Sequence, residues 1–143
     1  MTALDTNILV YARRKETPRH KEALRLLQEF AQGERPWALP WVCVYEFLRV
    51  VTHPRVFDPP TDLEVGLEDV ESLLDSPSLH MLGEGPQHRS LMRRMLLEGN
   101  ATGNLAHDAH IAALLLEHGV TEILTADRDL NRFPGIKAVD PFR

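Results

Sequence analysis

The sequence has a single cysteine, no long apolar run and fewer basic than acidic residues. Cys43 lies in the apolar segment 41–44 and cannot form an internal disulfide, so we expect a small core residue in a reducing compartment. The N-terminus has no basic region, and no apolar stretch approaches the length of a membrane span. Nothing here indicates export or membrane insertion, and we expect a cytoplasmic protein.

The charge balance argues against a broad nucleic-acid-binding surface. The formal net charge is −5 at pH 7, whereas non-specific binding of nucleic acids depends mainly on Lys and Arg. The densest basic groups are small, namely residues 13–15 and Arg89 with Arg93 and Arg94. Such groups are most often solvated faces, so charge alone identifies no partner.

The chain also lacks internal repeats, low-complexity tracts and a recognisable linker. Its 143 residues, with 43% hydrophobic and 26% charged content, fit one globular domain over residues 1–143. Short apolar strands are expected at Leu4, 37–39, 79–82 and 122–125. Helices are expected near 8–11 and over 17–33, 41–51, 61–76, 86–99 and 104–119, with Thr17, Thr61 and Asn104 as caps.

This alternation of strands and helices predicts an α/β domain with a parallel sheet covered on both faces. Sites in such sheets form where the carboxyl ends of strands meet helix N-termini. Asp5 and Asp127 each follow a predicted strand directly, so both should lie at the same edge of the sheet. Taken singly, an acid in this position is more often a turn former or a helix cap.

Two further acids lie on predicted apolar helix faces. Asp108 shares its face with Ile111 and Leu115, so it should face the packed side, although an internal capping role is an equal alternative. Glu46 lies among apolar neighbours, with Arg49 as its obvious charged partner. Such a pair contributes only about 0.2–0.5 kcal/mol, which hardly explains a buried carboxylate.

Four acids directed at one sheet edge would repel each other and resist ionisation unless cations lay between them. Mg²⁺ or Mn²⁺ would relieve this repulsion, because hard cations prefer oxygen ligands and often bridge carboxylates to a substrate phosphate. The chemistry that this arrangement implies is hydrolysis of phosphodiester bonds.

Four segments together carry a resemblance that spans essentially the whole chain: 4–12, 45–50, 104–112 and 124–129. In this order they resemble the PIN-domain nucleases, specifically the VapC-like toxins of toxin–antitoxin pairs. The resemblance implies a three-layer α/β/α sandwich and a Mg²⁺- or Mn²⁺-dependent endoribonuclease that cuts RNA. It also implies a homodimer and inhibition by a small antitoxin protein.

The same resemblance implies roles for individual residues. Catalytic and metal-binding roles fall on four acids: Asp5, Glu46, Asp108 and Asp127. Asp129 is a substitute or helper for Asp127, and the supporting polar groups are Thr6, Asn7, Asn104 and Thr125.

Three alternatives stay open from the sequence. The doublet His107-Asp108 is typical of HD-type metal phosphohydrolases, but those enzymes are all-helical. A serine hydrolase is disfavoured, because no Gly-x-Ser-x-Gly elbow is present and Ser90 lies on a polar helix face. The third alternative is a non-catalytic module that binds RNA or protein through an inactive acidic pocket.

Overall fold

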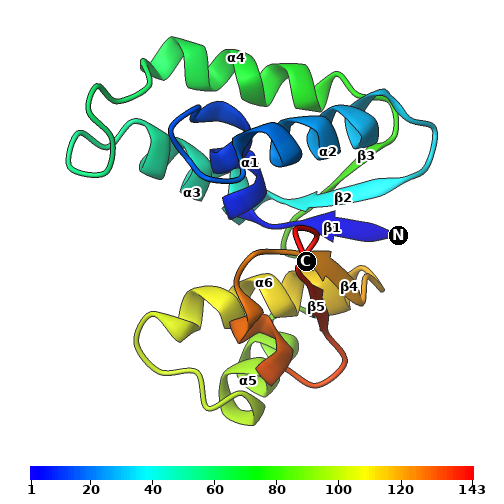
Figure 1. The fold of residues 1–143 in the computed structure, drawn as a ribbon. Helices are drawn as coiled ribbons and strands as arrows, with labels where there is room; N and C mark the ends of the chain where they lie inside the picture. The colour runs from blue at the N-terminus through cyan, green and yellow to red at the C-terminus, as the bar shows by residue number, and fades with distance from the viewer.

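The computed structural model describes all 143 residues and contains five strands and six α-helices (Figure 1). The strands are β1 (Thr2–Leu4), β2 (Trp37–Pro40), β3 (Leu79–Leu82), β4 (Glu122–Leu124) and β5 (Lys137–Val139). The helices are α1 (Thr6–Arg13), α2 (His20–Gln32), α3 (Trp41–Val51), α4 (Leu63–Leu74), α5 (His88–Glu98) and α6 (Leu105–Glu117), with a short 3-10 helix η1 (Arg128–Arg132). None of the helices combines the length and apolarity needed to cross a bilayer.

The five strands form one parallel sheet in the order β3-β2-β1-β4-β5. Figure 1 shows α1 to α4 gathered on the side of β2 and β3, and α5 and α6 near β4 and β5. This arrangement confirms the predicted α/β/α architecture, and its sheet excludes the all-helical HD-type fold. After β1, the chain adds β2 and then β3 on one side of β1. It then crosses over and adds β4 and β5 on the other side. Such a reversal opens a crevice at the carboxyl ends of the two central strands.

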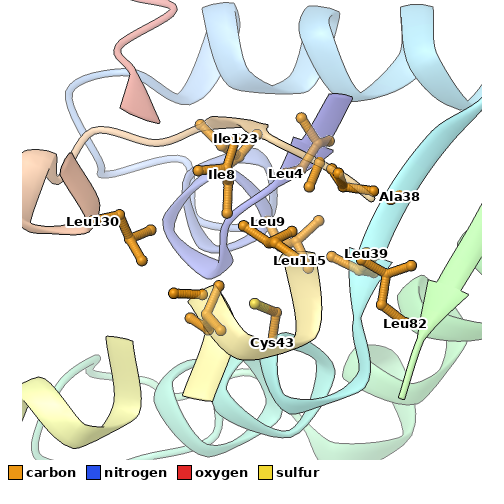
Figure 2. Packing of buried hydrophobic residues seen from close by; sticks show 14 of the residues in the cluster. Leu4, Ile8, Leu9, Ala38, Leu39, Cys43, Leu82, Leu115, Ile123 and Leu130 are labelled. Atoms are coloured by element: carbon orange, nitrogen blue, oxygen red, sulfur yellow. The ribbon is translucent and has the colours of Figure 1, made fainter. Parts of the chain in front are cut away.

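One hydrophobic cluster of 29 buried residues packs the helices against the sheet. Figure 2 shows Leu115 of α6 close to Leu9 of α1, while Cys43 of α3 points into the same cluster. Cys43 is fully buried, as predicted. The elements that carry the acids are therefore anchored by a shared core.

The predicted helix starts differ from those observed. Helix α2 begins at His20, because the Thr17 hydroxyl donates to the Arg14 carbonyl oxygen (2.7 Å) within a turn. The Thr61 capping box is also wrong: the Thr61 hydroxyl accepts from Nη1 of Arg14 (3.0 Å), and α4 begins without a side-chain cap. Asn104 does occupy the N-cap position of α6, but its side chain makes no capping hydrogen bond.

Truncation of Leu115 is expected to destabilise the fold strongly. Its side chain is 0% exposed in the core, so Leu115→Ala should lower the free energy of unfolding by about 2–5 kcal/mol. Leu97, which is 65% exposed on α5, supplies the control, and Leu97→Ala should change stability by less than about 0.5 kcal/mol. Urea denaturation measures both, and equal losses in the two variants would contradict the observed core.

Candidate metal and active site

The two central strands bring Asp5 and Thr125 together at their carboxyl ends. The Asp5 N–H donates to the Leu124 carbonyl oxygen (3.0 Å), which extends the pairing of β1 and β4 by one residue. On the other side, the Thr125 N–H donates to the Val139 carbonyl oxygen (2.9 Å). Both residues are therefore fixed by the backbone of the sheet.

The carboxylate of Asp5 is buried, with 7% of the residue exposed. Its Oδ1 accepts from the Thr6 N–H (2.7 Å) and its Oδ2 from the Thr125 hydroxyl (2.8 Å). The Cys43 thiol donates weakly to Oδ1 across 3.8 Å. Burial raises the pKa of Asp5 above its ordinary value, and the hydrogen bonds from Thr125 and Thr6 oppose that rise.

The Thr125 hydroxyl connects Asp5 to two other predicted site residues. Besides donating to Asp5, it accepts from Nδ2 of Asn7 (2.9 Å) and from the Asp127 N–H (3.0 Å). The Asn7 side-chain oxygen accepts from the Ala126 N–H (3.2 Å). This network fixes the loop after β4 against the start of α1.

Three further carboxylates form a cluster beside this network. Asp108, Asp127 and Asp129 each offer an oxygen, and these oxygens lie within 4.8 Å of one another. Asp127 caps η1, and its Oδ1 accepts from the Asp129 N–H (2.9 Å). Partial burial raises the pKa of Asp108 to about 6, and the nearby charges of Asp127 and Asp5 add to the rise. The structure thus brings together both acids considered for the fourth position.

Glu46 departs from the sequence-based expectation. Its side chain is 25% exposed, because it lies at the border of the buried face of α3. Its carboxylate accepts from Nη2 (2.6 Å) and Nε (3.0 Å) of Arg49, and this pair holds the pKa of Glu46 below its ordinary value. The expectation that Glu46 is buried is therefore wrong, whereas its role as a metal ligand stays a prediction.

His107 joins the site although the sequence-based set of site residues omits it. Burial governs the pKa values of Asp5 and Asp108, and Arg49 governs that of Glu46, but a positive charge on His107 would lower all three, so this residue lies within electrostatic reach of the acids. The doublet His107-Asp108 is the feature of the sequence that points to it. Asn104, in contrast, is exposed.

The oxygen-rich chemistry of the cluster fits a hard divalent cation. The carboxylates of Asp5, Asp108, Asp127 and Asp129 form no ion pair with any Lys or Arg. The Thr6 hydroxyl beside them is buried without a hydrogen-bond partner. Several negative charges without a compensating cation, surrounded by oxygen ligands, match the preferences of Mg²⁺ and Mn²⁺.

Comparisons with known proteins agree with this geometry. The family model described as "PIN domain" matches residues 2–136. The chain is 36% identical over 138 residues to ribonuclease VapC48 of Mycobacterium tuberculosis, covering 96% of this chain and 95% of that protein.

Two crystal structures share the fold. VapC20 of M. tuberculosis, described as a sarcin-ricin loop cleaving toxin, has a TM-score of 0.68 at 13% identity over 96% of this chain and 99% of its own. VapBC2 of Rickettsia felis, bound to a DNA fragment from its promoter, has a TM-score of 0.62 at 20% identity over 96% of each chain. Because the family model and the relative VapC48 both match nearly the whole chain, this chain belongs to the PIN-domain family.

Proposed function

We propose that this protein is a divalent-metal-dependent endoribonuclease and the toxin of a toxin–antitoxin pair. The observation that carries the proposal is the group of carboxylates, without basic partners, at the crevice between β1 and β4. The relatives named VapC ribonucleases support an RNA substrate, because they match this chain along nearly its full length.

We assign the ion-binding roles to Asp5, Asp108 and Asp127, with Asp129 beside them. A bound Mg²⁺ or Mn²⁺ would supply Lewis-acid activation of water and offset charge on the scissile phosphate. Asp5 is held in one orientation by donors on both oxygens, so it can offer a ligand without reorganising. Asp127 would complete a second ion position or orient the attacking water.

Glu46 enters this proposal as a ligand that exchanges partners. Its pair with Arg49 is largely solvent-exposed, and such pairs contribute about 0–1 kcal/mol. A divalent cation at the acids competes readily with so weak a pair. The Glu46 carboxylate would then exchange Arg49 for the ion. The homodimer implied by the family resemblance stays a prediction.

Asp5→Asn is expected to abolish RNA cleavage. The amide removes one negative charge and places a donor where the carboxylate accepts two hydrogen bonds, so both ion binding and the Thr125 network are weakened. Cleavage of total cellular RNA with Mn²⁺, Mg²⁺ or EDTA should fall by orders of magnitude in the variant.

The exposed residue Asp62 provides the control for this charge change, because it lies outside the site and its side chain caps no helix. Asp62→Asn should cleave like the wild type. If Asp5→Asn also cleaves at the wild-type rate, the assignment of the site is wrong. If the wild type cleaves nothing yet still binds RNA, the alternative of a non-catalytic binding module gains support.

Asp108→Asn should change how the stability of the metal-free protein depends on pH. The carboxyl group has a pKa of about 6 in the folded chain against an ordinary value of 3.8, so the folded state binds its proton more tightly. The free energy of unfolding therefore falls as the pH rises from about 4 to about 6. The Asn variant lacks this loss and should gain stability relative to the wild type across that window.

Denaturant unfolding of both proteins at about pH 4.5 and pH 7 measures this difference. Saturating Mn²⁺ should then favour the wild type, since at about 100 times the dissociation constant an ion adds roughly 2.7 kcal/mol. A stability difference that is independent of both pH and Mn²⁺ would make Asp108 a structural residue.

For the antitoxin, we propose a groove of about 430 Å³ between α1, α2 and α4. Its lining is mainly apolar and includes Leu9, Leu24, Leu27, Phe47 and Leu73. Helix α1 begins beside Asp5, so a segment lying along it reaches the acids within about 10 Å at 1.5 Å per residue. The occupant is an amphipathic segment of the antitoxin whose Arg or Lys approaches the carboxylates.

Leu24→Glu is expected to weaken the complex with the small protein encoded beside this chain by at least about tenfold, because it places a charge in an apolar contact. Leu24 is partly exposed, so the monomer should stay folded. Leu97→Glu makes the same change on α5, far from the groove lining, and serves as the control. Titration calorimetry that gives both variants equal affinities would exclude this groove.

A further inference from the structure

A second group of metal-ligating side chains lies on the opposite side of α6 from Asp108. Glu84 comes from the loop before α5, His88 is the first residue of α5, and His110 lies on α6. Each offers a ligand atom, and these atoms lie within 4.8 Å of one another. Because a helix turns about 100° per residue, His110 points about 200° away from Asp108. The group is therefore separate from the acidic cluster.

Glu117 holds the loop that carries Glu84 against α6. Its side chain is 6% exposed, and its carboxylate accepts from the N–H groups of Gly85 (3.0 Å) and Gln87 (2.9 Å). A Cβ at position 85 would collide with this carboxylate, so any other residue there would have to displace the Glu117 side chain. Nε2 of His118, the residue that follows α6, contacts the Gly83 carbonyl oxygen (2.8 Å). The backbone around Glu84 is thus already positioned.

His88 supplies an independent indication of a ligand. Its Nδ1 is buried without a hydrogen-bond partner and lies 3.9 Å from Oε1 of Glu117. Buried polar atoms are normally paired, so this nitrogen requires an explanation. In metal sites, the histidine nitrogen that does not bind the ion typically donates to a carboxylate, which fixes the tautomer. A small rotation of His88 would give that arrangement and direct Nε2 to an ion.

The remaining two ligands are already in contact. Nε2 of His110 and Oε1 of Glu84 are 2.7 Å apart, and the rings of His88 and His110 lie edge to face with centroids 5.4 Å apart. Ligands of a tetrahedral zinc lie about 2.0–2.2 Å from the ion. Closing the group around an ion therefore requires only side-chain adjustment, in which the hydrogen bond between His110 and Glu84 is exchanged for bonds to the ion.

We propose that Glu84, His88 and His110 form a transition-metal site that takes Zn²⁺. Two imidazoles and one carboxylate suit Zn²⁺ far better than Mg²⁺, and three protein ligands leave the fourth position for water. The Glu117 carboxylate would accept from Nδ1 of His88 and so orient its ring. The ion joins the start of α5 and the preceding loop to α6, the helix that also carries Asp108 (Figure 1). The site is independent of the proposed nuclease activity.

This proposal is tested by calorimetric titration of the untagged, metal-stripped protein with Zn²⁺. Excess Mg²⁺ is present throughout, so that the acidic cluster is filled. The wild type should bind one tight equivalent, and Co²⁺ in its place should give the absorption bands of a site with nitrogen ligands. Glu84→Gln and His110→Gln each remove a ligand and should weaken Zn²⁺ binding by at least about tenfold, since even the residues that orient ligands contribute that much. Both side chains are partly exposed, so these variants avoid the buried ring of His88.

Two controls locate the ion. His80→Gln removes an exposed histidine of β3 that takes no part in this group, and it should leave Zn²⁺ affinity unchanged. Asp127→Asn impairs the acidic cluster and should likewise leave the tight Zn²⁺ equivalent intact. The proposal is overturned if Zn²⁺ affinity survives His110→Gln and Glu84→Gln, or if it is lost in Asp127→Asn. If the Zn²⁺ affinity is the same in every variant, the contact between His110 and Glu84 serves only to pack the loop against α6.

Discussion

The hydrogen bonds of the Thr125 hydroxyl hold the acidic site together. A hydroxyl has one proton to donate, and here that proton goes to Asp5, while the oxygen accepts from Asn7 and from the Asp127 N–H. Because this oxygen already accepts two donors, Asp5 must act as an acceptor at Oδ2. The network thus favours the ionised form of Asp5, whereas burial opposes it. A bound cation would remove that conflict.

Helix starts provide the other compensation for the acids. Asp5 caps α1, Asp108 lies in the first turn of α6, and Asp127 caps η1. The N-terminus of a helix carries partial positive charge, which stabilises nearby carboxylates by about 0.3–1 kcal/mol each. This is too little to neutralise several acids within a few ångströms, as the raised pKa of Asp108 indicates. The fold therefore holds these acids close together without neutralising them, and a bound cation would supply the missing positive charge.

The location of the acids that follow strands could be predicted, because the position of the strands determines at which edge of the sheet these acids lie. Asp5 and Asp127 follow central parallel strands, so any correct assignment of β1 and β4 brings them to one edge. Glu46 could not be placed in this way, since helical periodicity does not tell which border of an apolar face meets the sheet edge. Its pairing with Arg49 depends on the local packing of α3, and the sequence allowed either outcome.

The missed strand β5 has a similar cause. It is three residues long, and only Ala138 of the three is buried, so no alternating pattern marks it. Its position is reinforced by Asn131, whose side chain accepts from the Ala138 N–H (2.8 Å) and donates to the Ala138 carbonyl oxygen (3.3 Å). Hydrogen bonds of this kind follow no apolar pattern, so a single sequence does not reveal them.

Arg13 and Arg14, two members of the basic group at residues 13–15, are engaged within the fold, which bears on how RNA could reach the acids. Arg13 forms a two-pronged pair with Asp69, and Arg14 is buried against Glu16 and Thr61. Phosphate backbones are drawn to proteins mainly by free Lys and Arg, and this chain has a net charge of −5. The carboxylates of the bare acidic cluster, which pair with no Lys or Arg, repel the phosphates of an approaching RNA strand. Divalent cations at the site would reverse that local charge, so their presence controls the approach of the substrate as well as the chemistry.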